Sequence, residues 1–565
     1  MNNIFSGLHL GLRALETQRK SLDVTGHNIA NANNENYNKQ RAVHKASYPY
    51  TAPGLSNHGG AGQFGTGVEI ETVERVKDQF INSQIFNETQ SAGYWTEMQR
   101  GLEKIEYIFN EPSDSGIDTA MNQFWNSLQD LSNNPSDDAA RNMVRENSYN
   151  LIDSFQSVEN QLTDYKDSID QNLNNAAVNV NEITTKIADL NKQIVSVKGS
   201  DQSPNDLLDE RDALYKELNS MLNVQSREDE QGNLIISADG KQIVNGSDAY
   251  ELEMIEDPDN EDRMILGHKK TGSPVNVKNG KIKAWMDVRD EELTVNIEKL
   301  NDLAENMVTE FNNQHKAGYD AEGNQGGDFF KSIASMDGDQ TVISQLVLDE
   351  NIADPDGGLD KIAAGNTVSD GSVVGIEKVD TSDITAKFEI DIRKVDPNDD
   401  DSDYEVTVTN LETDAEFGPE TVKKADNYKI GFDTATGNFT DVAGDIDFNI
   451  TAKSEGTAVV NLDEAIGNGE NANALSDIFE KDGNNIKSEF REIITSVGAN
   501  SSRAQRMVNN QEVVLKQLNT LDRSISGVSL DEEMANLIKY QQSYAAAAKY
   551  INKTEELLDS LMTIV

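Results

Sequence analysis

Hydrophobic residues recur every seven positions at both ends of the chain. Near the N-terminus the repeat consists of Met1, Leu8, Leu15, Leu22 and Ile29, with Phe5 and Leu12 at a companion position. Near the C-terminus it consists of Leu530, Leu537, Tyr544, Ile551, Leu558 and Val565, with Met534, Gln541, Ala548, Glu555 and Met562 as companions. A seven-residue apolar period is typical of a coiled-coil seam. We therefore expect a long helix at each end of the chain.

We expect the two terminal helices to pair with each other. A single heptad-bearing helix is more often a surface helix packed on its own domain, but two of similar length at opposite ends are naturally partners. The C-terminal helix has a clear predicted start, because Ser529 and Glu532 form a capping box after Gly527. Its stretch YAAAAKY, 544–550, has little side-chain bulk, which lets another backbone approach closely.

The N-terminal pattern changes character in the stretch LDVTGHNIANANNENYNKQ, 22–40. Gly26 costs about 1 kcal/mol inside a helix, and asparagine favours caps and turns. The asparagines are Asn28, Asn31, Asn33, Asn34, Asn36 and Asn38. One interpretation is a frayed helix end. The other, which we favour, is a contact surface whose amides bond neighbouring subunits, since an amide both donates and accepts hydrogen bonds.

The middle of the chain alternates between helical and strand-like patterns. The helical spacing of apolar residues predicts long helices over 136–203 and about 471–525, and a shorter one near 290–315. Between them the period becomes two, which predicts strands. The alternating sets are Phe388/Ile390/Ile392, Tyr404/Val406/Val408, Tyr428/Ile430/Phe432 and Ile446/Phe448/Ile450. Residues 232–246, GNLIISADGKQIVNG, predict an earlier hairpin.

This order of elements predicts an α+β protein. We expect a discontinuous stalk of terminal coiled-coil helices, with antiparallel β-rich outer domains inserted into it. The expected domains are the terminal coiled coil, 1–40 with 528–565; a long-helix stalk, 41–205 with 466–527; a β-rich domain, 206–344; and an acidic β-rich outer domain, 345–465.

Charge is distributed very unevenly along the 565 residues. Residues 1–110 and 481–565 each hold 10 basic and 11 acidic side chains, so nearly all of the net charge of −50 lies between them. General solubility or adaptation to salt would explain the acidity, but not why both ends are spared. Such a field repels nucleic acid and anionic membranes. We therefore expect ends that pack against neighbouring molecules and a middle that faces water.

Signs of chemistry are weak. The chain has no cysteine and six histidines, none in an HExxH motif, so thiol chemistry and common zinc sites are not expected. Gly60, Gly62 and Gly65 form a G-x-G-x-x-G, but strand-like residues come next where a cofactor site needs a helix. Asp320–Asn324 and the aspartates of 396–403 weakly suggest calcium, and solvated turns explain them better. We expect no enzyme activity, no cofactor, no metal, no membrane span and no secretory signal peptide.

Several segments resemble bacterial flagellar rod, hook and hook-associated proteins. The N-terminal signature of that family is similar to LETQRKSLDVTGHNIANAN, 15–33, and GTGVEIETVERVKDQF, 65–80, resembles the family segment C-terminal to that signature. The ending GVSLDEEMANLIKYQQSYAAAAKYI, 527–551, resembles the C-terminal signature of the hook-associated members. NDLLDERD at 205–212, GKIKAWMDVRDEEL at 280–293 and GYDAEGNQGGDFF at 318–330 resemble internal segments. Residues 345–465 carry no such resemblance.

The resemblance implies a structural subunit whose terminal helices form the inner layer of a hollow tube. It implies a ring at the hook–filament junction, with further copies of the chain, the hook protein and the next hook-associated protein as partners. It also implies an export chaperone on the C-terminal helix, and delivery outside the cell without a cleaved signal. The alternatives are another axial protein, such as the hook subunit or the third hook-associated protein, or a surface adhesin with the acidic strand domains as its binding surface.

The residues expected to form the assembly interface come from the two heptad seams and the asparagine stretch. They are Phe5, Leu8, Leu12, Leu15, Leu22, Asn28, Ile29, Asn31, Asn33, Leu530, Met534, Leu537, Tyr544, Ala548, Ile551 and Leu558. The chain departs from the family where a Thr-Pro-Gly turn is usual and Asn34-Glu35-Asn36 stands instead, followed by Tyr37. We expect Asn36 to adopt the left-handed conformation that glycine would supply.

Overall fold

The computed structural model divides the chain into two compact units, each assembled from separate stretches of sequence. Unit 1 comprises Met1–Gly101, Asp167–Glu291 and Ser501–Val565, and unit 2 comprises Leu102–Lys166 and Glu292–Asn500. The residues described are 2–48, 65–109, 116–321, 324–337, 340–365, 374–378, 387–394, 404–410, 415–422, 427–433, 438–440, 446–452, 456–461, 469–480 and 485–564. Three long helices, α2, α4 and α11, run from one unit into the other.

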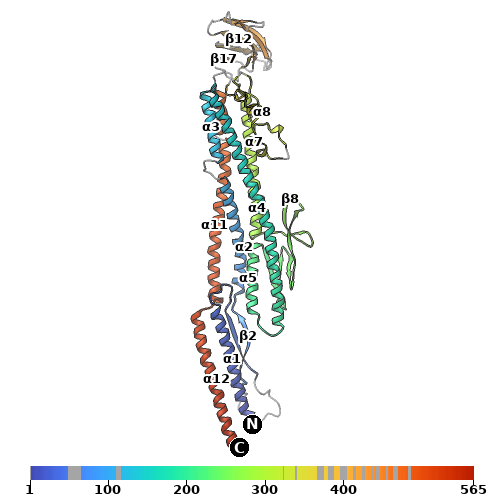
Figure 1. The fold of residues 1–565 in the computed structure, drawn as a ribbon, viewed down its shortest axis with the longest axis vertical. Coiled ribbons are helices and arrows are strands. Elements are labelled where there is room, and N and C mark those ends of the chain that lie inside the picture. Colours follow the sequence, from blue (N-terminus) through green and yellow to red (C-terminus); the bar gives the residue numbers. More distant parts are fainter. Residues whose placement is uncertain are drawn as a thin grey trace. The chain divides into compact units, whose positions relative to one another are not determined.

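Unit 1 contains the terminal helices and a set of β-hairpins (Figure 1). Its helices are α1 (Asn2–Ala30), the first part of α2 (Gln79–Phe109), the last part of α4 (Asp138–Lys198), α5 (Asn205–Met221), α6 (Lys281–Asp287), the last part of α11 (Ile486–Ser526) and α12 (Leu530–Ile564). Strands β1 (Gln40–Ala46) and β2 (Val68–Arg75) form an antiparallel pair with a bulge between Val43 and His44.

Two further antiparallel sheets of unit 1 are fastened to α4 by buried or half-buried asparagines. The first sheet contains β3 (Val224–Glu228), β4 (Leu234–Ala238), β5 (Lys241–Asn245) and β6 (Asp248–Ala249); the second contains β7 (Leu252–Asp257), β8 (Asn260–His268) and β9 (Ser273–Pro274). The amide of Asn191 donates to the carbonyl of Leu234 at 2.9 Å and accepts from its N–H at 2.9 Å. Asn181 bonds both backbone groups of Leu252 in the same way, at 2.8 Å each.

Unit 2 combines a helical core with two four-stranded antiparallel sheets. Its helices are the end of α2, α3 (Ile117–Asn133), the first part of α4, α7 (Thr294–Ala317), α8 (Glu350–Ala353), α10 (Glu470–Glu480) and the start of α11, with single 3-10 turns η2 (Ile333–Ser335) and η3 (Ile343–Gln345). The π-helical turn η1 (Val288–Leu293) joins α6 to α7 across the boundary between the units. Five phenylalanines form the centre of the helical core, and they are Phe124, Phe311, Phe329, Phe330 and Phe479.

The sheets of unit 2 have the orders β10-β16-β14-β15 and β13-β12-β11-β17. Their strands are β10 (Val374–Lys378), β11 (Lys387–Lys394), β12 (Tyr404–Asn410), β13 (Ala415–Val422), β14 (Asn427–Asp433), β15 (Asn438–Thr440), β16 (Ile446–Ala452) and β17 (Gly456–Asn461). Ile390 pairs with Val408 and Ile392 with Val406, and all four side chains are buried. The alternating apolar positions therefore give β11 and β12 one buried face, as period-two patterning requires.

The α+β class is confirmed, as are most of the predicted elements. The helix expected over 136–203 is α4, whose 61 residues correspond to about 90 Å at 1.5 Å per residue. The four alternating sets lie in β11, β12, β14 and β16, and the hairpin of 232–246 contains β4 and β5. The helix expected over 471–525 is two helices, α10 and α11. Gly60, Gly62 and the aspartates of 396–403 lie outside the described residues.

Candidate assembly surface and its polar joint

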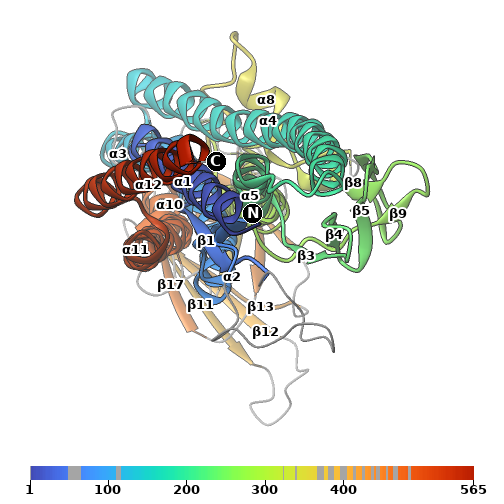
Figure 2. The same ribbon diagram turned by 90° about the horizontal axis from the view of Figure 1, so that it is seen from below.

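Helices α1 and α12 lie side by side and antiparallel in unit 1, as Figures 1 and 2 show. Two glycines of α1 lie directly against side chains of α12. A Cβ atom on Gly7 would lie 3.5 Å from Cγ2 of Thr554, and one on Gly11 would lie 2.6 Å from Cγ1 of Ile551. The expected close approach of backbones is therefore provided by α1, at a Gly-x-x-x-Gly spacing that the sequence interpretation did not use.

Replacing Gly11 with alanine is expected to loosen the α1–α12 contact. The methyl group removes the glycine penalty of about 1 kcal/mol in a helix, but it collides with the β-branched Ile551 side chain. Overpacking of this kind costs about 1–3 kcal/mol. Gly26→Ala is the matched control, because nothing lies within 4 Å of a Cβ atom there. Amide hydrogen exchange in α12 should accelerate in the Gly11 variant and be unchanged or slower in the Gly26 variant; equal behaviour would contradict the close contact.

The seam that α12 turns toward α1 differs from the predicted one in its companion positions. The heptad members Leu537, Tyr544, Ile551 and Leu558 are half-buried, as expected for a seam. The predicted companions Met534, Gln541 and Glu555 are exposed. The companion positions of the seam are instead occupied by residues one position earlier in the sequence, and these are Glu533, Tyr540, Ala547 and Thr554. From Glu533 onward the seam residues follow one another at alternating steps of four and three positions. Two of them, Glu533 and Thr554, are polar. Polarity concealed them from a search for apolar repeats.

The sixteen candidate interface residues divide into four groups in the structure. Half-buried are Leu8, Leu15, Leu22, Ile29, Asn31, Leu537, Tyr544, Ala548, Ile551 and Leu558. Exposed are Leu12, Asn33, Leu530 and Met534. Phe5 belongs to α1, and its side chain lies outside the described residues. Asn28 alone is fully buried, at 1% exposure.

The amide of Asn28, which we expected to bond a neighbouring subunit, forms its hydrogen bonds within this chain. Its Oδ1 accepts hydrogen bonds from the hydroxyl of Tyr37 at 2.7 Å and the N–H of Gln40 at 3.0 Å. Its Nδ2 donates to the carbonyl of Gln40 at 2.9 Å and to Oε2 of Glu533 at 3.1 Å. Two donors and two acceptors saturate an asparagine amide. Asn28 therefore joins α1, the following loop, β1 and α12 within one chain.

The turn at 34–37 also differs from the expectation. Asn36 does not have a positive φ, so it does not replace glycine in the left-handed region. Instead the Oδ1 of Asn34 accepts from the N–H of Asn36 at 3.1 Å, which is an Asx-type turn. The ring of Tyr37 is buried below it. Burial, with the nearby carboxylates of Asp206, Asp209 and Glu533, raises the pKa of its phenol.

The segment after this turn is held by acidic residues of α5. These residues and their partners form a cluster that we call the polar joint: Asn38, Arg75, Lys77, Asp209 and Asp212. Asp209 accepts from the side chain of Asn38 at 2.6 Å and from Arg75 at 2.8 Å. Asp212 accepts from Arg75 at 2.8 Å and from Lys77 at 2.6 Å. The motif NDLLDERD thus places carboxylates three residues apart on one helix face, where they meet β2 and the loop.

The two carboxylates of the joint have opposite pKa shifts. Burial raises the pKa of Asp209, and the bonds from Arg75 and Asn38 only partly oppose it. Burial also acts on Asp212, but Lys77 and Arg75 together outweigh it and lower its pKa. Asp212 faces two cations and Asp209 faces one, which explains the difference.

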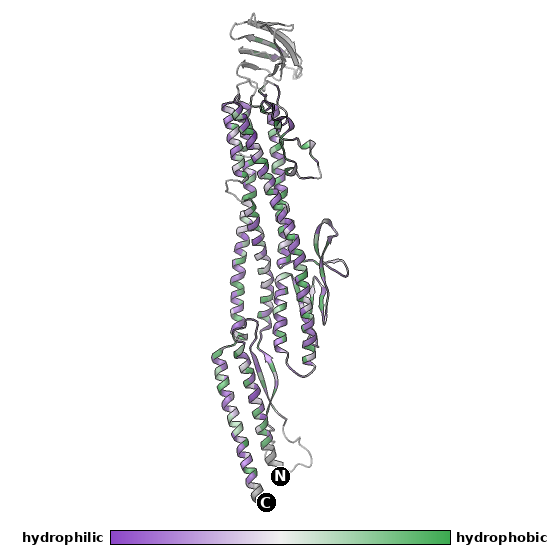
Figure 3. Ribbon diagram, in the orientation of Figure 1, coloured by the Kyte–Doolittle hydropathy of each residue, from purple (hydrophilic) through white to green (hydrophobic). Residues whose placement is uncertain are grey.

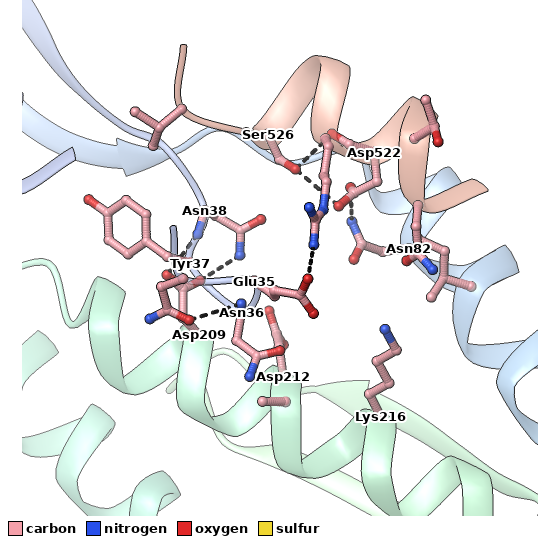
Figure 4. A pocket seen from close by; sticks show the side chains of 18 of the residues that line it. Glu35, Asn36, Tyr37, Asn38, Asn82, Asp209, Asp212, Lys216, Asp522 and Ser526 are labelled. Atoms are coloured by element: carbon pink, nitrogen blue, oxygen red, sulfur yellow. Dashed lines mark hydrogen bonds and ion pairs between the residues drawn. The ribbon is translucent and has the colours of Figure 1, made fainter. Parts of the chain in front are cut away.

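A cleft of about 850 Å³ separates this joint from α2 and α11. In the close-up of Figure 4, Asn38 and Asp209 point toward each other, and Asn82 points toward Asp522. The N–H of Lys39 donates to the carbonyl of Ser526 at 2.8 Å, which ties the loop to the end of α11. At the start of α12 the N–H of Glu532 lies 3.5 Å from the Ser529 hydroxyl, which is one half of the predicted capping box, whereas the carboxylate of Glu532 accepts from Lys39 at 2.7 Å. The loop next to the joint is thus tied to the segment that precedes α12.

Exposed apolar side chains form stripes on two helices of unit 1. On α12, Leu530, Met534 and Ile538 are 52%, 50% and 55% exposed and follow one face at four-residue steps. On α11, Val514, Leu521 and Ile525 are also exposed, with the half-buried Leu518 between them. Hydrophobic and hydrophilic residues alternate closely along both helices in Figure 3. The sequence interpretation missed the α11 stripe, although its steps of four, three and four residues are a heptad signal.

Asp320 takes part in a turn of unit 2. Its Oδ1 accepts from the N–H of Asn324 at 2.8 Å, and its Oδ2 lies 3.5 Å from Nζ of Lys361. Within the described ranges, no cluster of three or more histidines, aspartates or glutamates is arranged to hold a metal ion. Nor does any helix in the described part of the chain have the length and apolar character needed to cross a bilayer.

Comparison with known proteins gives consistent matches. The family model described as the flagellar hook-associated protein FlgK helical domain matches residues 102–330, and that of the flagellar basal body rod FlgEFG protein C-terminal matches residues 524–564. Flagellar hook-associated protein 1 of Bacillus subtilis (strain 168) is 27% identical and covers 100% of this chain and 98% of its own. The protein of the same name from Escherichia coli (strain K12) is 28% identical, with coverage of 100% and 99%.

A solved structure shares the fold. The flagellar hook junction protein FlgK from Burkholderia pseudomallei aligns with a TM-score of 0.52 and 15% identity, over 78% of this chain and 100% of that one. The relatives span the chain from end to end, and the two family models fall on the helical region and on α12. The chain is therefore similar over its whole length to flagellar hook-associated protein 1 of other bacteria, and over 102–330 it matches the family model of the FlgK helical domain.

Proposed function

We propose that this chain is a structural subunit of the bacterial flagellum that forms a ring at the hook–filament junction. The observation that carries the proposal is the exposed apolar face of α12, made by Leu530, Met534 and Ile538. Contiguous exposed apolar side chains mark surfaces that other proteins cover. The face belongs to a terminal segment with 10 basic and 11 acidic side chains, 481–565, in a chain of net charge −50. Copies can therefore meet there without the repulsion that their acidic middle regions would cause.

The partners proposed for this surface are further copies of the chain. The hook protein on one side of the ring and the next hook-associated protein on the other complete the junction. Before export, a cytoplasmic chaperone is proposed to cover the C-terminal helix, because exposed apolar faces otherwise aggregate. The subunit is proposed to act outside the cell, delivered by the flagellar export apparatus. Its role is mechanical, and no catalytic step is proposed.

A deletion strain tests the proposal directly. Cells that lack the chain should carry hooks without filaments and release flagellin into the medium, and expression of the intact chain should restore filaments. A matched complementation with the chain truncated before Leu530 separates loss of α12 from loss of the whole protein; it should behave like the deletion. Normal filaments on the deletion strain would rule out the junction role. Normal filaments with the truncated chain would rule out α12 as the assembly surface.

A further inference from the structure

The heptads of α1 and α12 do not by themselves define how far one helix slides along the other. Apolar or small residues recur every seven positions on both helices, so a shift of one heptad, about 10 Å, again brings similar side chains together. The native pairing places Thr554 beside Gly7 and Glu533 beside Asn28. Repeating seams of this kind need a polar residue to specify one register.

Glu533 is the group that breaks this repetition. It is 2% exposed and lies on the seam of α12, followed by Leu537, Tyr540 and Tyr544. Its Oε2 accepts from Nδ2 of Asn28 at 3.1 Å, and its Oε1 lies 3.9 Å from Nζ of Lys39. A buried carboxylate is stable only where donors and an opposite charge compensate its lost hydration. In the described part of α12, Glu533 is the single charged residue that is buried.

A slipped register would remove both partners of Glu533. Sliding α12 by one heptad in one direction would bring Glu533 opposite Ser21, and sliding it in the other would carry it past the end of α1 at Ala30. Asn28 cannot follow, because its remaining hydrogen bonds hold it to the backbone of Gln40 and to Tyr37. In the first case the carboxylate would exchange the Asn28 amide and Lys39 for the Ser21 hydroxyl, which lies 2.9 Å from Nε2 of His44. In the second case it would leave α1 altogether. The apolar seam tolerates a slip, and the Glu533 contact does not.

We infer that the contact of Glu533 with Asn28 and Lys39 specifies the register in which the two ends of the chain pair. Glu533 is thus a positioning residue of the terminal helix pair. The polar joint holds the loop that carries Lys39, so the register of α12 is set from the polar joint through Asn28. The inference concerns pairing within one chain and does not rest on the proposed role in the flagellum.

Cysteine cross-linking tests the inference in the full-length chain, which has no cysteine of its own. Gly7→Cys with Thr554→Cys reports the native register, since a Cβ on Gly7 lies 3.5 Å from Cγ2 of Thr554. Gly7→Cys with Ala547→Cys, and Ala14→Cys with Thr554→Cys, report slips of one heptad in opposite directions. With Glu533 present, the native pair should form disulfide at least tenfold faster than either slipped pair.

Glu533→Leu should make at least one slipped pair cross-link nearly as fast as the native pair. The ratio of the slipped rate to the native rate should therefore rise about tenfold. Glu533→Gln retains an acceptor for Asn28 and should restore the native preference. Glu532→Leu is the matched control, because Glu532 also binds Lys39, at 2.7 Å, but is exposed; its ratio should not change. The register role is disproved if Glu533→Leu slows cross-linking of all three pairs in proportion or leaves the ratio of their rates unchanged. Comparable cross-linking yields from all three pairs in the parent chain would also disprove it.

Discussion

Leu537→Asp is expected to abolish incorporation of the chain into flagella. Leu537 lies on the seam of α12, four residues after the buried Glu533 and three before Tyr540. A second carboxylate there would be half-buried with no cation assigned to it, at a cost of several kcal/mol. Because the terminal helices bury few side chains completely, a loss of this size should separate them. Leu15→Asp, at the half-buried heptad position of α1, should act in the same way.

Incorporation is measured by complementing the deletion strain and counting filaments, with the amount of exported chain followed in the medium. Leu537→Met conserves volume and apolarity and should retain most of the activity. Leu537→Asn has the size of the aspartate without its charge and should have an intermediate effect. The helical core of unit 2 should melt as in the parent chain, since Leu537 belongs to unit 1. Normal filament numbers with Leu537→Asp would show that this seam is not needed for assembly.

Long periodic elements could be predicted from the sequence because their signal is local. The 61 residues of α4 keep an apolar stripe at helical spacing without an interrupting proline. Four strands of unit 2, β11, β12, β14 and β16, each contain an alternating set that spans five residues. Each pattern reports which face is buried, whatever the face packs against. The terminal heptads predicted the helices α1 and α12 for the same reason.

The function of the asparagines could not be predicted in this way. An amide on a helix end indicates a cap, a turn or a contact, and nothing local distinguishes these. In the structure Asn28, Asn181, Asn191 and Asn312 each bond backbone groups of a neighbouring segment through both amide atoms. A buried asparagine can complete an irregular segment because it has the donor and acceptor of a peptide unit.

The polar joint was beyond sequence reasoning because its partners are far apart. Arg75 and Asp209 are 134 positions apart, and the excess of acidic residues supplies many other candidate partners for each cation. Asp209 and Asp212 were visible as part of a family-like segment, but their role depends on where β2 and the loop are folded. The same holds for Glu533, which stands next to a capping box in the sequence and is a buried seam residue in the structure.

Lowering the pH should destabilise unit 2 through His315. This side chain is completely buried; its Nδ1 donates to the carbonyl of Gly327 at 2.8 Å, and its Nε2 accepts from the N–H of Ala363 at 2.8 Å. A second proton would break the bond to Ala363, and burial lowers the pKa of His315 to about 4. The unfolded chain, with a histidine pKa of about 6.5, therefore binds this proton first. The free energy of unfolding is unaffected above a pH of about 6.5 and falls as the pH drops toward 4, by about 3 kcal/mol in all.

The sequence allows this contribution to be isolated. His315 is the only histidine, and Trp125 the only tryptophan, within 102–166 and 292–500, so Trp95→Phe with Trp285→Phe leaves a fluorescence probe specific to unit 2. Denaturant unfolding between pH 7.5 and 5.5, where most carboxylates stay ionised, should show a loss of about 1 kcal/mol. His315→Gln should lower stability at every pH, because one of the two bonds is lost, but remove this slope. A slope that persists in the variant would mean that another group titrates, and would contradict the assignment of His315 as the neutral link between α7 and Ala363.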